Sequence, residues 1–105
     1  MKIIRTGFQG LFELETRVFG DSRGYFFESY KRDLFVELGI KEEFVQSNES
    51  FSVKRTLRGL HYQKDPHAQA KIVRVVRGKV LDVAVDLRHE SPTFGKFHTV
   101  ILDAE

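Results

Sequence analysis

The segment LRGLHYQKDPHAQAK, residues 57–71, gathers side chains suited to acid–base and electrostatic chemistry. Arg58, His61 and Lys71 lie there between strand-forming apolar residues, where packing alone does not require them. A neutral imidazole exchanges protons near neutral pH, so His61 is a candidate general base. Arg58 and Lys71 are cations of the kind that stabilises a developing anion.

Each of these residues also has an ordinary structural interpretation. A strand histidine is more often a half-buried residue that donates to a backbone carbonyl than a catalyst. Lys71 begins an apolar run, where its stem can be buried while its amine stays in water. Arg58 can equally be a surface arginine. The choice is between a catalytic strand and a polar loop.

Four further polar residues lie in settings that suit ligand binding. Arg23 lies in the turn GDSRG, where flanking glycines allow close backbone approach and a guanidinium can bind phosphate through two donors. Glu28 shares strand parity with neighbouring aromatic residues, and Gln46 and Asn48 are two residues apart and share a face. A solvated turn arginine and a surface glutamate are the alternatives.

The elements that position these residues read mostly as short strands. Residues 11–19 and 24–30 are rich in aromatic and β-branched residues and flank GDSRG, which indicates a hairpin or an adjacent pair. Residues 31–40 place apolar residues at helical spacing and reach Gly39, which predicts one short helix. Later strands are expected in FVQSNES, VKRTLRGLHY, AKIVRVV, KVLDVAVDL and KFHTVIL, so the pattern favours an all-β sandwich or barrel of the jelly-roll kind.

Two positions decide how the predicted strands present the site. Arg58 and His61 are three residues apart and point to opposite faces of a regular strand, unless a bulge at Gly59 turns both into one cavity. A hairpin at Arg77 and Gly78 allows a tight register, with Asp82 near Lys71, or a bulged register, with Val75 opposite Lys79. Arginine tolerates positive φ poorly, which favours the bulged register. The closing run FHTVILDAE has no following segment to pair with and leaves an apolar edge.

Length and composition limit the function classes. A chain of 105 residues, 41% of them hydrophobic, suits a single domain over 1–105. The absence of cysteine excludes disulfides and thiolate metal sites and favours the cytoplasm. A net charge of +2 with interspersed signs gives little support for nucleic acid binding but allows a small anionic ligand. No apolar run approaches the roughly 20 residues needed to cross a membrane.

The run LRGLHYQKDPHAQAKIVRVVRGKVLDVAVDLRHESPTFGKF, with FGDSRGYFFES and FVQSNES, resembles the dTDP-4-dehydrorhamnose 3,5-epimerase family over essentially the whole chain. The resemblance implies a cupin-type jelly roll (a double-stranded β-helix), truncated here because family members are longer. It also implies a strand-exchanged dimer and a cofactor-free reaction on a dTDP-linked 4-keto-6-deoxyhexose. By the same resemblance, His61 is the general base, Arg58 and Lys71 lie at the sugar, and the nucleotide sugar is bound by Arg23, Glu28, Gln46 and Asn48.

The chemistry of such a reaction suits these residue types. Epimerisation beside a ketone removes an acidic C–H proton and holds an enolate until a proton returns on the other face. Imidazole is the side chain whose ordinary pKa best matches such a base. A general base contributes roughly 100- to 10,000-fold, so the cations must stabilise the enolate oxygen.

The sequence departs from the family in lacking counterparts of its general acid, a tyrosine, and of the aspartate that orients the base. Tyr62 points away from His61 in a strand, and Asp82 can orient His61 only in the tight register. No metal is expected, because cupin metal sites use a His-x-His pair, and His61 and His67 do not have that spacing. The alternatives are a non-catalytic nucleotide-sugar-binding or assembly module and a related dTDP-sugar ketoisomerase.

Overall fold

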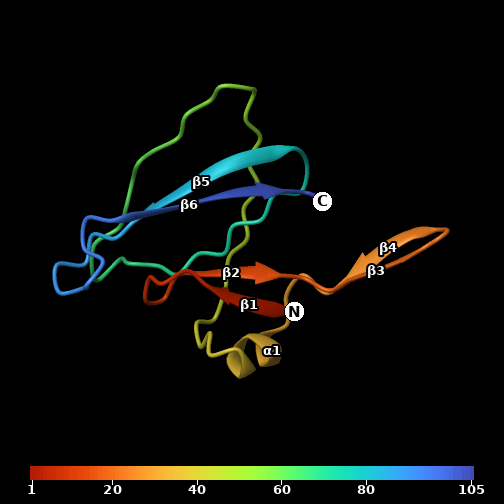
Figure 1. Ribbon diagram of the computed structural model, residues 1–105, viewed down its shortest axis with the longest axis horizontal. Coiled ribbons are helices and arrows are strands. Elements are labelled where there is room, and N and C mark those ends of the chain that lie inside the picture. Colours follow the sequence, from red (N-terminus) through yellow and green to blue (C-terminus); the bar gives the residue numbers. More distant parts are fainter. The chain divides into compact units, whose positions relative to one another are not determined.

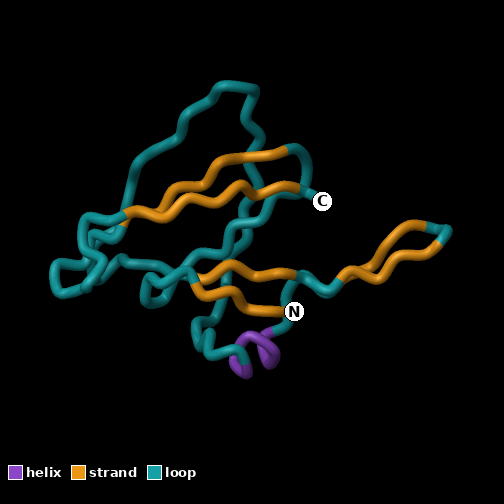
Figure 2. Tube along the Cα trace, in the orientation of Figure 1, coloured by secondary structure: helices purple, strands orange, loops and turns teal.

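The computed structural model describes all of residues 1–105. Its chain divides into unit 1, Met1–Ile40 with Arg74–Glu105, and unit 2, Lys41–Val73. Unit 1 contains all of the regular secondary structure, namely six strands in three antiparallel pairs and one helix (Figure 1). Unit 2 is drawn as continuous loop (Figure 2).

The first strand pair joins β1 (Lys2–Arg5) to β2 (Phe12–Glu15). Thr6 closes the connection, because its Oγ1 donates to the Leu11 carbonyl at 2.9 Å and accepts from the Phe8 amide at 3.2 Å. A threonine that bonds to nearby backbone in this way stabilises a turn.

The predicted hairpin around GDSRG is confirmed as β3 (Val18–Asp21) and β4 (Gly24–Phe27), with Asp21 opposite Gly24. The run 11–19 is not one strand, however, because β2 ends at Glu15 and pairs with β1, whereas β3 begins at Val18 and pairs with β4. The chain changes partner between the two strands.

The predicted helix is confirmed as α1 (Arg32–Glu37). Its Phe35 is 1% exposed and meets the Tyr30 ring edge-on, with ring centroids 4.8 Å apart. Beyond the helix, Gly39 has φ of 88°, and the Ile40 amide donates to the Phe35 carbonyl at 2.8 Å. This glycine-dependent C-terminal motif satisfies the last carbonyls and ends the helix.

The third pair joins β5 (Lys79–Val85) to β6 (Phe97–Asp103), from Lys79 opposite Asp103 to Val85 opposite Phe97. Both predicted registers of a hairpin at Arg77 and Gly78 are therefore wrong. β5 pairs instead with the later segment β6, and the connection between the two strands is held together by hydrogen bonds to Asp86. β6 lies at an edge of this two-stranded sheet, as expected for the closing run.

Asp86 organises the connection from β5 to β6. Its side chain is 2% exposed and accepts from Arg88 Nε at 2.9 Å, from Arg88 Nη2 at 3.0 Å, and from the hydroxyls of Ser91 and Thr93. The side-chain hydrogen bond from Arg88 holds the pKa of the Asp86 carboxyl well below its usual range, and the hydrogen bonds from Ser91 and Thr93 lower this pKa further. Gly95 completes the connection by donating to the Asp86 carbonyl at 2.8 Å.

Within unit 1, His98 joins the first and third strand pairs. His98 Nε2 on β6 lies 2.9 Å from Glu13 Oε1 on β2, a pair 85 residues apart in the sequence. The His98 ring also lies 5.9 Å from the Phe8 ring, at 60°. The side chains of His98 and Glu13 are 25% and 33% exposed, so this polar contact is partly sheltered from water.

The strands predicted over VKRTLRGLHY and AKIVRVV, and the extended lead-in FVQSNES, are not formed. Residues 41–73 contain no strand, and each residue from 49 to 71 is exposed. A strand is stabilised through hydrogen bonds to a neighbour. These segments have no partner strand in the structure, so their β propensity is not expressed.

The molecule's one helix, six residues long, is too short and too polar to span a bilayer.

Candidate functional site

Unit 2 carries five of the seven predicted site residues. Gln46 Nε2 donates to Asn48 Oδ1 at 3.3 Å, so the two amides contact one another although no strand forms here. Arg58 donates from Nε to Ser52 Oγ at 2.9 Å and from Nη2 to the Phe51 carbonyl at 3.2 Å. The amides and the arginine are therefore oriented by partners within unit 2.

His61 and Lys71 are both exposed. No hydrogen bond or ion pair joins either of them to the other or to Arg58. The structure therefore does not bring His61 and Arg58 into one cavity, which was the arrangement that a bulge at Gly59 would have allowed. The cause is the same as for the missing strands, because a cavity wall needs a paired sheet behind it.

Gly59 departs from strand geometry, as its position suggested, but without a paired strand it does not form a bulge. Its φ is 106°, a conformation that side-chain-bearing residues rarely adopt. A Cβ added at Gly59 would lie 3.3 Å from Nδ1 of His61. Glycine at this position thus lets the imidazole lie close to the backbone.

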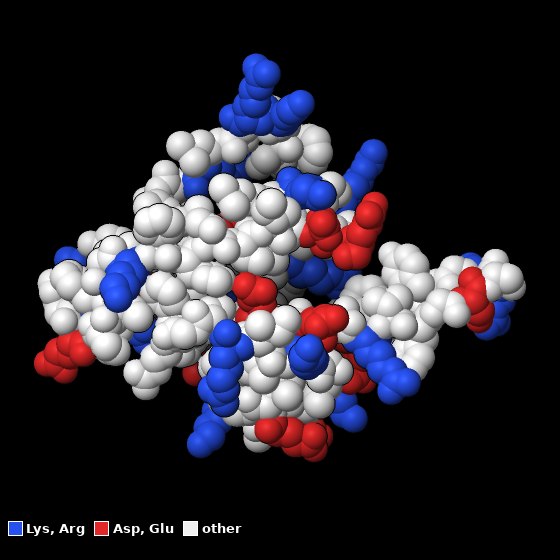
Figure 3. All heavy atoms as spheres, in the orientation of Figure 1, with Lys and Arg blue, Asp and Glu red and all other residues white.

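Unit 1 carries the other two predicted residues. Arg23 lies in the β3–β4 turn and binds Asp21, with Nη2 to Oδ2 at 2.7 Å and Nε to Oδ1 at 3.3 Å. Figure 3 shows acidic and basic side chains next to one another at the far end of this hairpin. The contact lowers the pKa of Asp21 and raises that of Arg23. One edge of the guanidinium is thus engaged, and Nη1 stays available to an anion.

Glu28 follows β4, which ends at Phe27, and its side chain is exposed. The strand parity that was expected between Glu28 and its neighbouring aromatic residues therefore does not apply, because Glu28 and Tyr30 both lie beyond the strand. Both Arg23 and Glu28 are on the hairpin or next to it, where exposed aromatic residues accompany them: Phe19, Tyr25 and Phe26 are 52%, 72% and 70% exposed.

Asp82 could orient His61 only in the tight register, and that register is not formed. It lies on β5 opposite Val100 of β6, so the register that brought it near Lys71 is absent. Tyr62, which was not assigned the acid role, is 65% exposed.

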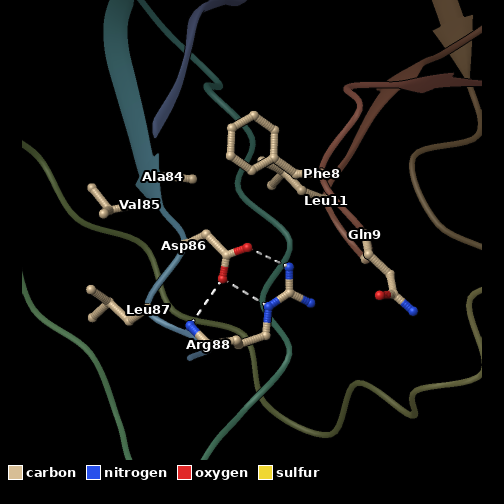
Figure 4. A pocket seen from close by; sticks show the side chains of 9 residues that line it. Phe8, Gln9, Leu11, Ala84, Val85, Asp86, Leu87 and Arg88 are labelled. Atoms are coloured by element: carbon tan, nitrogen blue, oxygen red, sulfur yellow. Dashed lines mark hydrogen bonds and ion pairs between the residues drawn. The ribbon is translucent and has the colours of Figure 1, made fainter. Parts of the chain in front are cut away.

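A hollow of about 310 Å³ in unit 1 is lined by none of the seven predicted site residues. It lies between the 8–11 turn and the end of β5, with Arg88 held at its rim by Asp86 (Figure 4). Sequence reasoning missed this corner. The available signal was DLRHESPT, which places a cation and two hydroxyls within seven residues of one aspartate.

The sequence matches the family model described as dTDP-4-dehydrorhamnose 3,5-epimerase over residues 5–105. It is 54% identical to the enzyme of that name from Shigella flexneri, covering 100% of this chain and 59% of the relative. It is 46% identical to the one from Methanothermobacter thermautotrophicus, covering 99% of this chain and 56% of the relative. The chain therefore spans a little over half the length of these relatives.

Solved structures agree with the sequence matches. The structure of dTDP-4-dehydrorhamnose 3,5-epimerase from Bacillus anthracis, with TDP and PPi bound, superposes with a TM-score of 0.94 at 48% identity, covering 98% of this chain and 59% of its own. That of dTDP-6-deoxy-D-glucose-3,5-epimerase from Legionella pneumophila, in complex with dTDP-4-keto-L-rhamnose, gives a TM-score of 0.91 at 48% identity, covering 98% and 55%. The predicted all-β, cupin-type fold and the family resemblance are confirmed.

Proposed function

Because the chain belongs to the dTDP-4-dehydrorhamnose 3,5-epimerase family, we propose that it serves to epimerise a dTDP-linked 4-keto-6-deoxyhexose at the two carbons flanking the ketone. The observation that carries the proposal is the match over residues 5–105 to the epimerase model, a span that contains all seven predicted site residues. The complex of the Legionella relative with dTDP-4-keto-L-rhamnose supports the substrate class.

In the proposed reaction, His61 removes the proton next to the ketone. Its exposure leaves it free to meet a substrate, and Gly59 lets it approach the backbone closely. Electrons from the broken C–H bond move into an enolate, whose oxygen is stabilised by Lys71 and Arg58. Inversion requires a proton to return to the same carbon from the opposite face. Because the family's tyrosine acid has no counterpart in this chain, we assign that proton to a water molecule on that face, and no cofactor takes part.

Substrate binding is assigned to the remaining predicted residues. The free Nη1 of Arg23 is suited to the diphosphate, while its other edge is held by Asp21. Gln46 and Asn48, joined by a hydrogen bond, retain donors and acceptors for the nucleotide sugar. Glu28 lies next to the β3–β4 hairpin with its exposed aromatic residues, and it is suited to accept hydrogen bonds from a sugar or base.

The proposed assembly is a homodimer with exchanged strands. β6 has an edge without a neighbour, and the outer face of the β5–β6 pair exposes Leu81, Phe97 and Ile101 at 66%, 65% and 61%. Apolar residues beside an open strand edge are typical of a surface that another strand covers. We place the dimer in the cytoplasm, since a chain without cysteine needs no oxidising compartment to fold.

Solvent deuterium uptake by the dTDP-4-keto sugar tests the proposed function. Uptake at both carbons that flank the ketone is the expected result. Migration of the ketone to a neighbouring carbon would identify a ketoisomerase instead. Binding of the sugar nucleotide without any exchange would reduce the chain to a binding or assembly module.

A further inference from the structure

Arg58 lies at the end of a short loop that folds back on itself. The Thr56 amide donates to the Val53 carbonyl at 3.2 Å, and Arg55 has φ of 70°. A non-glycine residue in this left-handed region marks a sharp local reversal. The reversal returns Arg58 to the residues that precede the turn, Phe51 and Ser52.

Both partners of Arg58 engage one edge of its guanidinium. Nε donates to Ser52 Oγ at 2.9 Å, and Nη2 donates to the Phe51 carbonyl at 3.2 Å. The guanidinium is planar and its N–H groups point in fixed directions. Holding Nε and Nη2 in place therefore also sets the direction of the N–H groups on Nη1. Nη1 makes no hydrogen bond within the chain and points both of its protons away from the loop's partners.

We propose that Ser52 is a positioning residue for Arg58, an inference that rests on the proposed function. The serine hydroxyl accepts from Nε and so presents Nη1 to the enolate oxygen of the substrate. Ser52 itself does not touch the sugar. Without the hydroxyl, Arg58 keeps only the bond to the Phe51 carbonyl, and a long exposed side chain then samples several rotamers.

The expected kinetic effect is specific to a positioning role. Arg58 acts on charge that develops in the transition state, so loss of its orientation lowers kcat and leaves KM nearly unchanged. Solvent screens this exposed contact, so its loss is expected to cost no more than an ordinary hydrogen bond, a decrease in kcat of roughly 3- to 10-fold. Ser52→Thr retains a hydroxyl on the same atom and should restore most of the rate.

The matched control is Ser50→Ala, because Ser50 lies in the same exposed segment and makes no hydrogen bond to Arg58. Four proteins are compared: the parent, Ser52→Ala, Ser52→Thr and Ser50→Ala. The kcat should fall in Ser52→Ala alone. An unchanged kcat in Ser52→Ala, or an equal fall in Ser50→Ala, would overturn the assignment of Ser52.

A second measurement reports on the arginine without requiring turnover. The ¹⁵N relaxation of Arg58 Nε should show an ordered group in the parent, in Ser52→Thr and in Ser50→Ala, and a mobile one in Ser52→Ala. Equal order in parent and Ser52→Ala would refute the positioning role. Absence of exchange in the parent would refute the proposed function instead, and the relaxation data would still decide whether Ser52 holds Arg58.

Discussion

At the scale of the residue, Asp86 is the side chain with the most hydrogen-bonding partners. It accepts from a guanidinium, two hydroxyls and the Arg88 amide, and it is almost completely buried. A buried carboxylate is tolerated only when it is paired in this way. Sequence reasoning missed this cluster, because each partner alone is an ordinary loop residue and only their shared nearness to Asp86 in DLRHESPT gave a signal. The spacing of Gln46 and Asn48 suggested that they lie together, but the expected reason, a shared strand face, does not apply because no strand forms there.

Replacing Asp86 with asparagine should change how stability depends on pH. The pKa of the folded carboxyl lies below that of an unfolded aspartate, about 3.9. Its contribution is therefore present above that pH and is lost as the pH falls toward the folded pKa. The Asp86→Asn variant should be less stable than the parent at pH 7, and the difference should shrink as the pH falls from about 4 to about 2.

Urea denaturation at several pH values measures this effect. Asp65→Asn is the control, since Asp65 is exposed and lies in a turn. A difference between parent and Asp86→Asn that stays constant down to pH 2 would show that the charge of Asp86 is not what stabilises the loop.

At the scale of the element, local patterns were predicted well and long-range pairing was not. The β3–β4 hairpin and α1 follow from nearby residues, namely the GDSRG turn and the glycine at position 39. β5 and β6 are connected through the Asp86 loop, and the alternation of apolar residues within each strand does not indicate which strands pair. The expected strands in unit 2 failed for a related reason, since β propensity requires a partner.

The contact between His98 and Glu13 should contribute measurable coupling between the first and third strand pairs. A double-mutant cycle with alanine at each position is expected to give roughly 0.5 to 1 kcal/mol, because the pair is only partly exposed. Lys2 and Glu15 provide the control pair on the same hairpin, at 3.8 Å and 75% and 63% exposed, and should give nearly zero. Equal coupling energies for the two pairs would contradict this role.

At the scale of the whole molecule, we propose one cupin-like domain over 1–105 that needs a second protomer or further chain to enclose its site. His61, Lys71 and Arg58 are all exposed, whereas an enolate is stabilised best where water is excluded. The residue types of the site could be predicted, because they follow from the motif. Their enclosure could not, since it depends on strands that this chain does not pair.

Light scattering tests the proposed assembly. The parent should have twice the mass of the chain, and Ile101→Lys should lower it to one chain mass by placing a charge on the exposed face of β6. Val36→Lys on α1, where the side chain is 51% exposed, should have no effect. A parent that is monomeric at all accessible concentrations would rule out the homodimer.

The most direct test of the central claim, that His61 takes a carbon-bound proton, is deuterium uptake by the dTDP-4-keto sugar in the parent, His61→Ala and His67→Ala. His67 is the control because it is an exposed histidine in the adjacent loop. If His61 is the base, uptake beside the ketone occurs in the parent and in His67→Ala, and it falls roughly 100-fold or more in His61→Ala while binding is largely retained. Exchange by His61→Ala at the parental rate would show that His61 is not the base.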